Sequence, residues 1–137
     1  MALPKKLPIR WMPDLHTAHI GRFNDSEQFF LAQHAVPSIT DDSRNREYIA
    51  LYCFDGSGTL TSYKIVESLD SATEEVIDAL LTGLGPHKFS DICVAPFQVA
   101  FDGYLFGLIP DVQRGTIQLE PGSMIVFMEP WDGEYYT

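Results

Sequence analysis

Basic residues, cysteines and long hydrophobic runs are all scarce in this sequence. Nine Lys and Arg stand against nineteen Asp and Glu, and the formal net charge at pH 7 is −10. Three of the nine basic residues lie in the first ten positions, so the remainder of the chain is more acidic still. A surface of this sign repels nucleic acids and anionic membranes and attracts basic protein surfaces. We therefore expect a basic protein as the partner, and neither nucleic acid nor membrane.

The two cysteines, Cys53 and Cys93, lie in apolar runs. A disulfide-rich secreted domain needs more than two cysteines, so the sequence predicts buried thiols in a reducing compartment. Their apolar or acidic neighbours disfavour a reactive thiolate. The first ten residues lack the continuous apolar segment of a signal peptide, and no run approaches the roughly 18 apolar residues of a membrane helix. We therefore predict a cytoplasmic protein.

The composition is that of a folded domain. Of the 137 residues, 45% are hydrophobic, and the chain has nine Phe, six Tyr and two Trp. Disordered chains are poor in aromatic residues, and a chain of this length suits one domain that buries about two-thirds of its unfolded surface. We predict a single domain over 1–137, with an extended N-terminal arm over 1–14 and an acidic, aromatic tail over 129–137.

The clearest local structure is a β-hairpin over 97–109. Asp-Gly at 102–103 separates two alternating apolar runs, and this dipeptide is typical of a type I′ turn, in which both residues have positive φ. Pairing Phe101 with Tyr104 places the apolar side chains of both runs on one face. The turn residues and the hydrophobic pattern therefore predict the same register.

Three further hairpins are predicted from β-branched and aromatic runs that flank turn residues. Their strands are 19–23 with 27–34, 47–54 with 59–66, and 116–120 with 124–128. In the second of these hairpins neither face is polar. Its apolar side chains would divide into Ile49, Leu51, Cys53 and Leu60 on one face and Tyr48, Tyr52, Phe54 and Tyr63 on the other. We therefore expect it to be covered on both faces. The polar residues of 37–46 predict an exposed loop.

One amphipathic helix is predicted at about 71–84. Ser71 and Glu74 form a capping box, and Gly83, Gly85 and Pro86 end the helix. Between them an apolar stripe recurs with helical period, at Val76, Ile77, Leu80, Leu81 and Leu84. The order of elements predicts an α+β fold: a mostly antiparallel sheet of six to eight strands built from consecutive hairpins, with this helix packed on one face.

The sequence contains no recognisable catalytic, cofactor-binding or metal-binding motif. His16 and His19 are three residues apart, but Pro13 favours an extended segment there, in which the two side chains would point to opposite faces. His34 and His87 could each act with an acid in proton transfer. We predict no cofactor and no metal.

Acidic residues gather in three places that could meet a basic partner. They are the loop acids Asp41 and Asp42, the acids of the helix and its approach, Glu67, Asp70, Glu74, Glu75 and Asp78, and the tail residues Trp131, Asp132, Glu134 and Tyr135. Aromatic side chains ringed by carboxylates suit capture of an Arg- and Lys-rich surface. Two structural alternatives remain open: a solvated helix face with acids near its positive end, and a tail whose aromatic side chains cover a sheet edge.

Several short stretches also carry a resemblance. They are Ile20-Gly21-Arg22, Tyr48 with Phe54-Asp55-Gly56, residues 91–97, Asp102-Gly103 with Phe106-Gly107, and Trp131–Tyr135. In these stretches the chain resembles a group of small actinobacterial proteins, some of which carry the automatic label formate hydrogenlyase regulatory protein HycA. The resemblance spans most of the chain and consists of turn glycines, strand aromatics and the terminal Trp, so it implies a shared fold. The label implies a regulator, yet the sequence has neither a basic DNA-reading element nor a redox motif.

Three functions remain as hypotheses. The first is a non-enzymatic binding protein, of the immunity, inhibitor or regulator type, that recognises a basic protein through its acidic surface. The second is a small enzyme whose site is built from His34, His87 and an acid. The third is a small-ligand binder that uses an aromatic-lined sheet. The charge balance favours the first.

Overall fold

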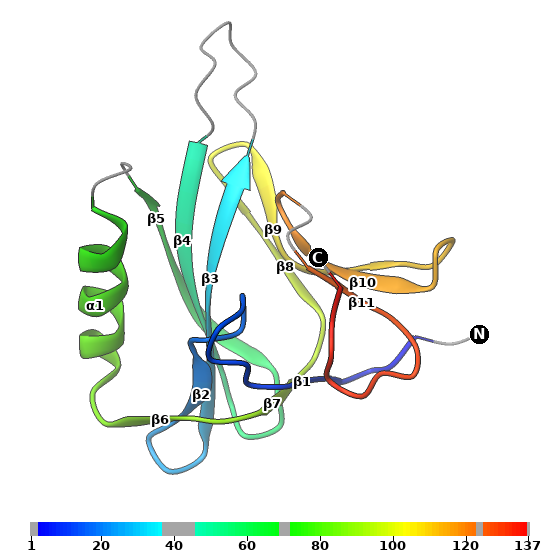
Figure 1. Ribbon diagram of the computed structural model, residues 1–137, viewed down its shortest axis with the longest axis horizontal. Helices are drawn as coiled ribbons and strands as arrows, with labels where there is room; N and C mark the ends of the chain where they lie inside the picture. Colours follow the sequence, from blue (N-terminus) through cyan, green and yellow to red (C-terminus); the bar gives the residue numbers. More distant parts are fainter. Residues whose placement is uncertain (1–2, 37–45, 69–71, 123–124, 137) are drawn as a thin grey trace, which may run out of the picture.

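A five-stranded β-sheet forms the middle layer of the protein, with a helix on one face and a second sheet on the other (Figure 1). The computed structural model describes residues 3–36, 46–68, 72–122 and 125–136. Within these ranges there are eleven strands and one helix. In chain order they are β1 (Leu7–Ile9), β2 (Ile20–Phe23), β3 (Glu27–Val36), β4 (Arg46–Phe54), β5 (Leu60–Ser68), α1 (Thr73–Leu84), β6 (His87–Phe89), β7 (Ile92–Val94), β8 (Phe97–Phe101), β9 (Tyr104–Asp111), β10 (Thr116–Glu120) and β11 (Val126–Phe127).

The strands pair antiparallel in three sheets. Their order is β5-β4-β3-β2-β6 in the five-stranded sheet and β11-β10-β9-β8 in the four-stranded sheet, while β1 and β7 form a separate ribbon. The structure confirms the predicted α+β class, because the described ranges are mostly antiparallel β, built from hairpins, with one helix packed against β4 and β5. The division into three sheets had no signal in the sequence, since it depends on contacts between hairpins that are distant along the chain.

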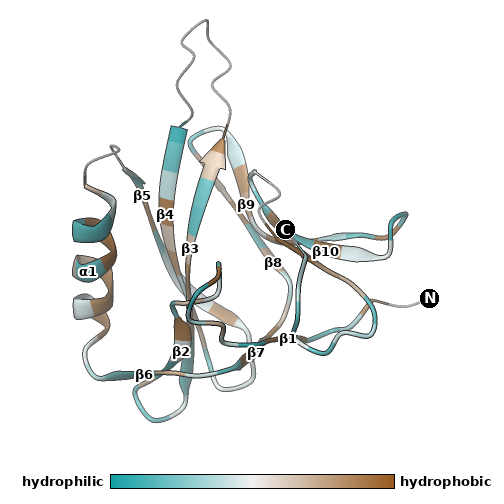
Figure 2. Ribbon diagram, viewed as in Figure 1, coloured by the Kyte–Doolittle hydropathy of each residue, from teal (hydrophilic) through white to brown (hydrophobic). Residues whose placement is uncertain are grey.

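Strand β4 is covered on both faces, as predicted for its hairpin, but β5 is an edge strand whose side chains are mostly exposed, so the prediction was wrong for β5. Side chains alternate along a strand, so neighbours enter different layers. Tyr48 and Tyr52 are fully buried against the four-stranded sheet, whereas Ile49 and Leu51 are buried against α1. The hydropathy colours in Figure 2 follow the same plan, with apolar segments concentrated in the middle of the sheet and on the side of α1 that faces it. Burial of each such side chain contributes about 1.5–3 kcal/mol.

The hairpin of β8 and β9 has the predicted turn and register. Asp102 and Gly103 have φ of 52° and 82°, as a type I′ turn requires. Phe101 pairs with Tyr104, and the register continues inward along both strands. The other three predicted hairpins are also confirmed, in β2–β3, β4–β5 and β10–β11.

One residue of the β4–β5 hairpin lies on the face opposite to the predicted one. The register shifts between Cys53 and Phe54, so Leu60 pairs with Phe54. A β-bulge of this kind inserts a residue and reverses the alternation beyond it. Leu60 therefore packs against the core between the two larger sheets, while Cys53 faces α1.

The N-terminal segment and the C-terminal tail are held together over that same core. Leu7 and Ile9 of β1 are fully buried. The Arg10 amide donates to the carbonyl oxygen of Gly133 at 2.9 Å, and a Cβ on Gly133 would crowd Arg10. Tyr136 forms a bridge with Val126 next to β11. The two ends of the described chain therefore support each other.

Between β1 and β2 the chain turns, where an extended segment was expected. The Leu15 amide donates to the Met12 carbonyl at 3.1 Å, and the Ala18 amide donates to the Leu15 carbonyl at 3.2 Å. Pro13 occupies the second position of the first turn, where its fixed φ is favourable. The extended prediction for residues 16–19 was wrong because it took Pro13 as favouring an extended segment and missed its turn-forming role.

Helix α1 begins at Thr73 and ends at Leu84, close to the predicted bounds. Ala72 is the N-cap residue and provides no side-chain cap, while the predicted cap, Ser71, lies outside the described residues. Gly85 follows with φ of 78°, and its amide donates to the Thr82 carbonyl oxygen. The predicted loop at 37–46 also lies outside the described residues, except for Arg46, which begins β4.

We expect the substitution Gly107→Ala to destabilise the fold strongly. Gly107 lies in β9 with φ of 147°, and a Cβ there would overlap the carbonyl oxygen of Phe97 on β8. Urea denaturation should show a loss of more than about 2 kcal/mol in the free energy of unfolding. Gly83→Ala is the control, because it adds a methyl group to a helix and meets no atom within 4 Å. It should stabilise the protein by about 0.5–1 kcal/mol. Equal stability of wild type and Gly107→Ala would contradict the described packing of β8 on β9.

Candidate functional site

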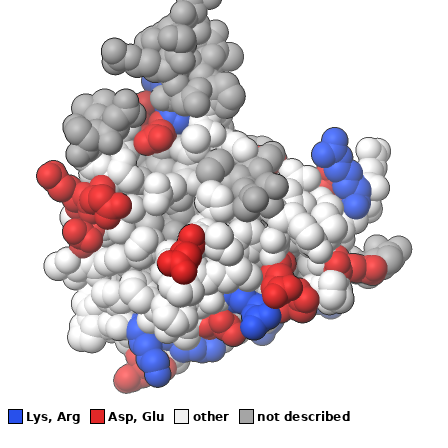
Figure 3. Space-filling model, in the orientation of Figure 1, with Lys and Arg blue, Asp and Glu red and all other residues white. Residues whose placement is uncertain are grey.

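The first half of α1 presents an acidic face to solvent. Glu74, Glu75 and Asp78 are exposed, and the sequence of α1 contains neither Lys nor Arg. Among the residues that the structure describes, none forms an ion pair with these three carboxylates. Figure 3 shows acidic side chains gathered on this side of the molecule. Acids in the first turn also interact favourably with the positive end of the helix.

The end of β5 adjoins this helix face. The hydroxyls of Ser68 and Thr73 lie 3.1 Å apart, which brings the last residue of β5 against the first residue of α1. Glu67 precedes Ser68 and is exposed, and it forms an ion pair with Arg46 at 3.2 Å. The structure therefore brings Glu67 next to the helix acids. The other predicted residues on this side, Asp41, Asp42 and Asp70, lie outside the described residues.

Arg46 compensates part of the negative charge at this end of the sheet. Its guanidinium also lies 3.7 Å from the carboxylate of Asp102, which accepts a hydrogen bond of 2.6 Å from the Tyr48 hydroxyl. This network joins β4, β5 and the turn between β8 and β9. Sequence reasoning missed it, because Asp102 was assigned only to a turn. In the described part of the chain, Arg46 therefore compensates Glu67 and Asp102 and forms no ion pair with Glu74, Glu75 or Asp78.

The tail residues lie away from α1, on the side of the four-stranded sheet (Figure 1). Trp131 and Tyr135 are partly buried against the core between the sheets, and the Tyr135 hydroxyl accepts a hydrogen bond from the Thr17 amide. Glu134 pairs with Arg10 at 3.2 Å, while Asp132 is exposed. The predicted acids therefore do not all converge on one face. The aromatic side chains of Trp131 and Tyr135 pack against the core between the sheets.

His34 is buried between the two larger sheets, and both of its ring nitrogens have hydrogen-bond partners. Its Nδ1 lies 3.1 Å from the Pro121 carbonyl oxygen, and its Nε2 lies 3.0 Å from the Tyr52 hydroxyl. A carbonyl oxygen can only accept, so Nδ1 donates to Pro121 and the neutral ring accepts from Tyr52 through Nε2. Burial lowers the pKa of His34 to about 4, although the hydrogen bond with the backbone of Pro121 acts in the opposite direction and raises it. This histidine is neutral at pH 7.

The structure does not bring His34 and His87 together. His34 faces the four-stranded sheet, whereas the His87 ring contacts Phe29 on the α1 side at 5.7 Å between centroids. They lie on opposite faces of the five-stranded sheet, because His87 pairs with Phe23, whose side chain packs against the cluster under α1. The proton-transfer site that combined them was a wrong expectation, since side-chain direction along distant strands is invisible in the sequence.

The remaining histidines, His16 and His19, pack against different aromatic rings. His16 packs near Tyr135 and His19 near Phe89, with ring centroids 6.4 Å and 5.8 Å apart. Burial lowers the pKa of His19, and Glu74 and Asp78 oppose that shift. Within the described ranges, no group of three or more His, Cys, Asp or Glu side chains could hold a metal ion.

The two cysteines differ in environment. Cys53 is buried, and burial raises the pKa of its thiol, so it remains protonated. Cys93 is exposed, contrary to the prediction of two buried thiols. The strand β7 that carries Cys93 is three residues long, and its side chains alternate, so Ile92 and Val94 point into the core while Cys93 points outward. This alternation could not be recognised in the sequence, because the residues on either side of Cys93 are both apolar.

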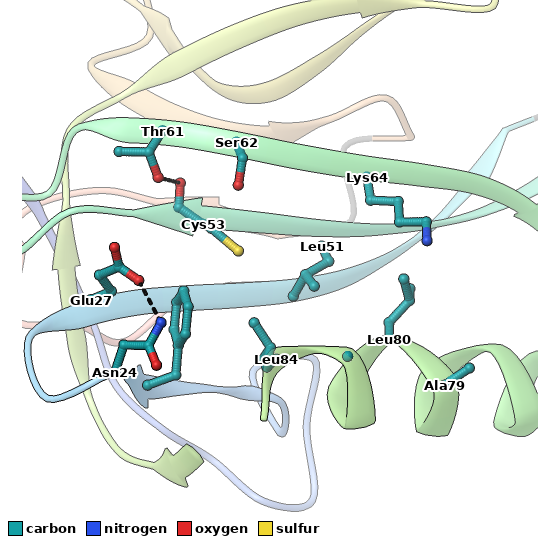
Figure 4. Close-up of a pocket in the computed structure, with 12 residues that line it drawn as sticks. Asn24, Glu27, Leu51, Cys53, Thr61, Ser62, Lys64, Ala79, Leu80 and Leu84 are labelled. Atoms are coloured by element: carbon teal, nitrogen blue, oxygen red, sulfur yellow. Dashed lines mark hydrogen bonds between the residues drawn. The ribbon is translucent and has the colours of Figure 1, made fainter. Parts of the chain in front are cut away.

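A groove that was not predicted from the sequence lies beneath the second half of α1. It has a volume of about 410 Å³ and lies between α1, strands β4 and β5, and the β2–β3 turn (Figure 4). Leu51, Leu80 and Leu84 form its apolar floor and wall, while Glu27 and Lys64 are among its polar residues. This size is near the lower end for small-molecule sites.

Comparison with known proteins does not assign a function to these surfaces. A scan of family models and searches of curated proteins and of solved structures found no match for this chain. Across the described residues, no helix is long and apolar enough to cross a membrane. The function must therefore be argued from the chemistry of the surfaces themselves.

We expect stability to fall between pH 6.5 and pH 4 because of His34. In the folded protein the pKa of His34 is about 4, below the ordinary histidine value of 6.5, so over this range the unfolded chain binds the proton more readily. The contribution of neutral His34 to the free energy of unfolding is complete above pH 6.5 and is lost as the pH falls. The loss amounts to about 3 kcal/mol by pH 4. Chemical denaturation at several pH values measures it. The variant His34→Gln should be less stable at pH 7 and should show a flatter profile, whereas an unchanged profile in this variant would contradict the assignment.

Proposed function

We propose that this protein is a non-enzymatic binding protein, of the immunity, inhibitor or regulator type, that recognises a basic protein partner. The surface that binds is formed by Glu74, Glu75 and Asp78 of α1, with Glu67 at its border; we name it the α1 acidic surface. The observation that carries the proposal is that the three helix carboxylates are exposed and, within the described chain, have no cationic partner.

The α1 acidic surface has the properties of an electrostatic recognition element. Opposite charge accelerates encounter and disfavours wrong partners. The helix is also a firm support, because Ile77 and Leu80 are 2% and 6% exposed and anchor it to the sheet. A rigid acidic face loses little conformational freedom when a partner binds.

The enzyme alternative has less support in the described structure. A catalytic acid–base pair needs a titratable group with an acid neighbour in an accessible cleft. His34 is 1% exposed, and its ring nitrogens bind a carbonyl and a hydroxyl. Cys53 is a protonated thiol whose pKa is raised. Binding by surface charge requires none of these groups to react.

We expect neutralisation of the α1 acidic surface to weaken binding of a basic probe. A fluorescein-labelled decalysine peptide is titrated by anisotropy with wild type and with the triple variant Glu74→Gln, Glu75→Gln, Asp78→Asn. Each lost ion pair at an exposed site is worth up to about 1 kcal/mol, so the affinity should fall about tenfold. The difference should shrink as salt is added, because salt screens exposed charges.

A charge-matched variant separates location from net charge. The triple variant Asp25→Asn, Glu129→Gln, Asp132→Asn also removes three exposed carboxylates, but none of them lies on α1. It should bind decalysine within about twofold of wild type, since long-range attraction from net charge is mostly screened at physiological salt. If both triple variants lose affinity equally, the peptide senses only net charge and the α1 acidic surface is not the binding site.

A further inference from the structure

The groove beneath α1 is hollow because two small residues line it from the helix. Ala79 and Gly83 are four residues apart and both border the groove. Gly83 lies inside a helix, where glycine costs up to about 1 kcal/mol relative to alanine. No positive φ requires it, and a Cβ built on it would meet no atom within 4 Å. Neither backbone conformation nor close packing requires glycine here, and the absence of a long side chain at this position leaves the groove open.

The floor of the groove is apolar and continuous with the core. Leu51 of β4 and Leu80 of α1 belong to the cluster that joins the helix to the sheet, and Phe23 and Leu84 pack against that cluster. All four line the groove. A ligand with apolar side chains would remove this surface from water, which is favourable by about 25 cal/mol per Å² of apolar area.

The two ends of the groove carry opposite charges. Figure 4 shows Lys64 at one end and Glu27 with Asn24 at the other. Lys64 pairs with Leu51 across the β4–β5 ladder, so its side chain starts on the α1 face. Among the described residues Lys64 has no ion-pair partner, and Glu27 receives one hydrogen bond of 3.3 Å, from the Asn24 amide. A ligand of one charge would meet a like charge at one end, whereas a zwitterion with an apolar middle matches both.

We propose that this groove binds a short apolar peptide with free termini, of dipeptide or tripeptide size. Its ammonium group lies at Glu27, its carboxylate lies at Lys64, and its side chains cover Leu51, Leu80 and Leu84. The Ser62 hydroxyl, which projects toward the groove between those ends, is placed to bind a peptide group (Figure 4). Cys53 contributes a wall and no chemistry, because its thiol stays protonated. This site is separate from the α1 acidic surface and does not rest on the proposed function.

The test is a chemical-shift titration of ¹⁵N-labelled full-length protein with the dipeptide Leu-Leu. Wild type and Gly83→Ala should bind with affinities within about twofold, because one methyl group leaves most of the hollow open. Gly83→Met should raise the dissociation constant at least about tenfold, since its side chain fills the space of the ligand. Thermal unfolding of both variants verifies that they remain folded, which is expected at an exposed helix position.

Terminal caps test the orientation of the ligand. N-acetyl-Leu-Leu and Leu-Leu-amide each lose one charge, and each should bind wild type roughly fivefold more weakly. Acetylation should have no effect on binding to Glu27→Gln, and amidation should have no effect on binding to Lys64→Met. If no chemical shifts change around the groove at up to about 10 mM Leu-Leu, the proposal is overturned, because a complementary site would bind the dipeptide more tightly than that. Unchanged affinity in Gly83→Met, or caps that act equally in wild type and both charge variants, would overturn it as well.

Discussion

Burial of the central strands from both sides is the constraint on which the rest of the structure depends. Adjacent residues of β3 and β4 enter two different layers, so Phe29 and Ile49 pack under α1 while Phe30 and Tyr48 pack under the four-stranded sheet. A strand that is apolar on both faces cannot be stable with either layer missing. The helix and the second sheet are therefore both required for the same reason, and the terminal segments complete the second of these two cores.

The position of α1 follows from this constraint, and so do its two exposed features. Its apolar stripe is used against the sheet, which leaves the opposite face free for charge. The first half of that free face is acidic, and the second half has small residues that leave a groove against β4 and β5. One helix therefore carries a surface suited to a basic macromolecule and, beside it, a hollow suited to a small zwitterion. The buried His34 lies in the other core, where its ring packs among the core side chains and both ring nitrogens form hydrogen bonds.

Sequence reasoning succeeded where the determining interactions are local. The Asp102-Gly103 turn sets the register of its own hairpin, and the helix stripe gives the bounds of α1 within two residues at its start. It failed where distant residues decide the outcome. A bulge moved Leu60 to the other face, the ion pairs of Arg46 link β4, β5 and the β8–β9 turn, and the groove exists only when α1 lies across β5. The acidic residues of the helix were predicted from the sequence, but which acids Arg46 pairs with depends on the fold.

The central claim is that recognition is localised on the first half of α1. The most direct measurement is a ¹H–¹⁵N NMR titration of the labelled protein with unlabelled decalysine at physiological salt, with shift changes mapped residue by residue. The account predicts the largest changes at the amides of Glu74, Glu75 and Asp78, with smaller changes at Glu67. Changes of equal size spread over all exposed acids, or changes centred on the tail at 129–134, would contradict it.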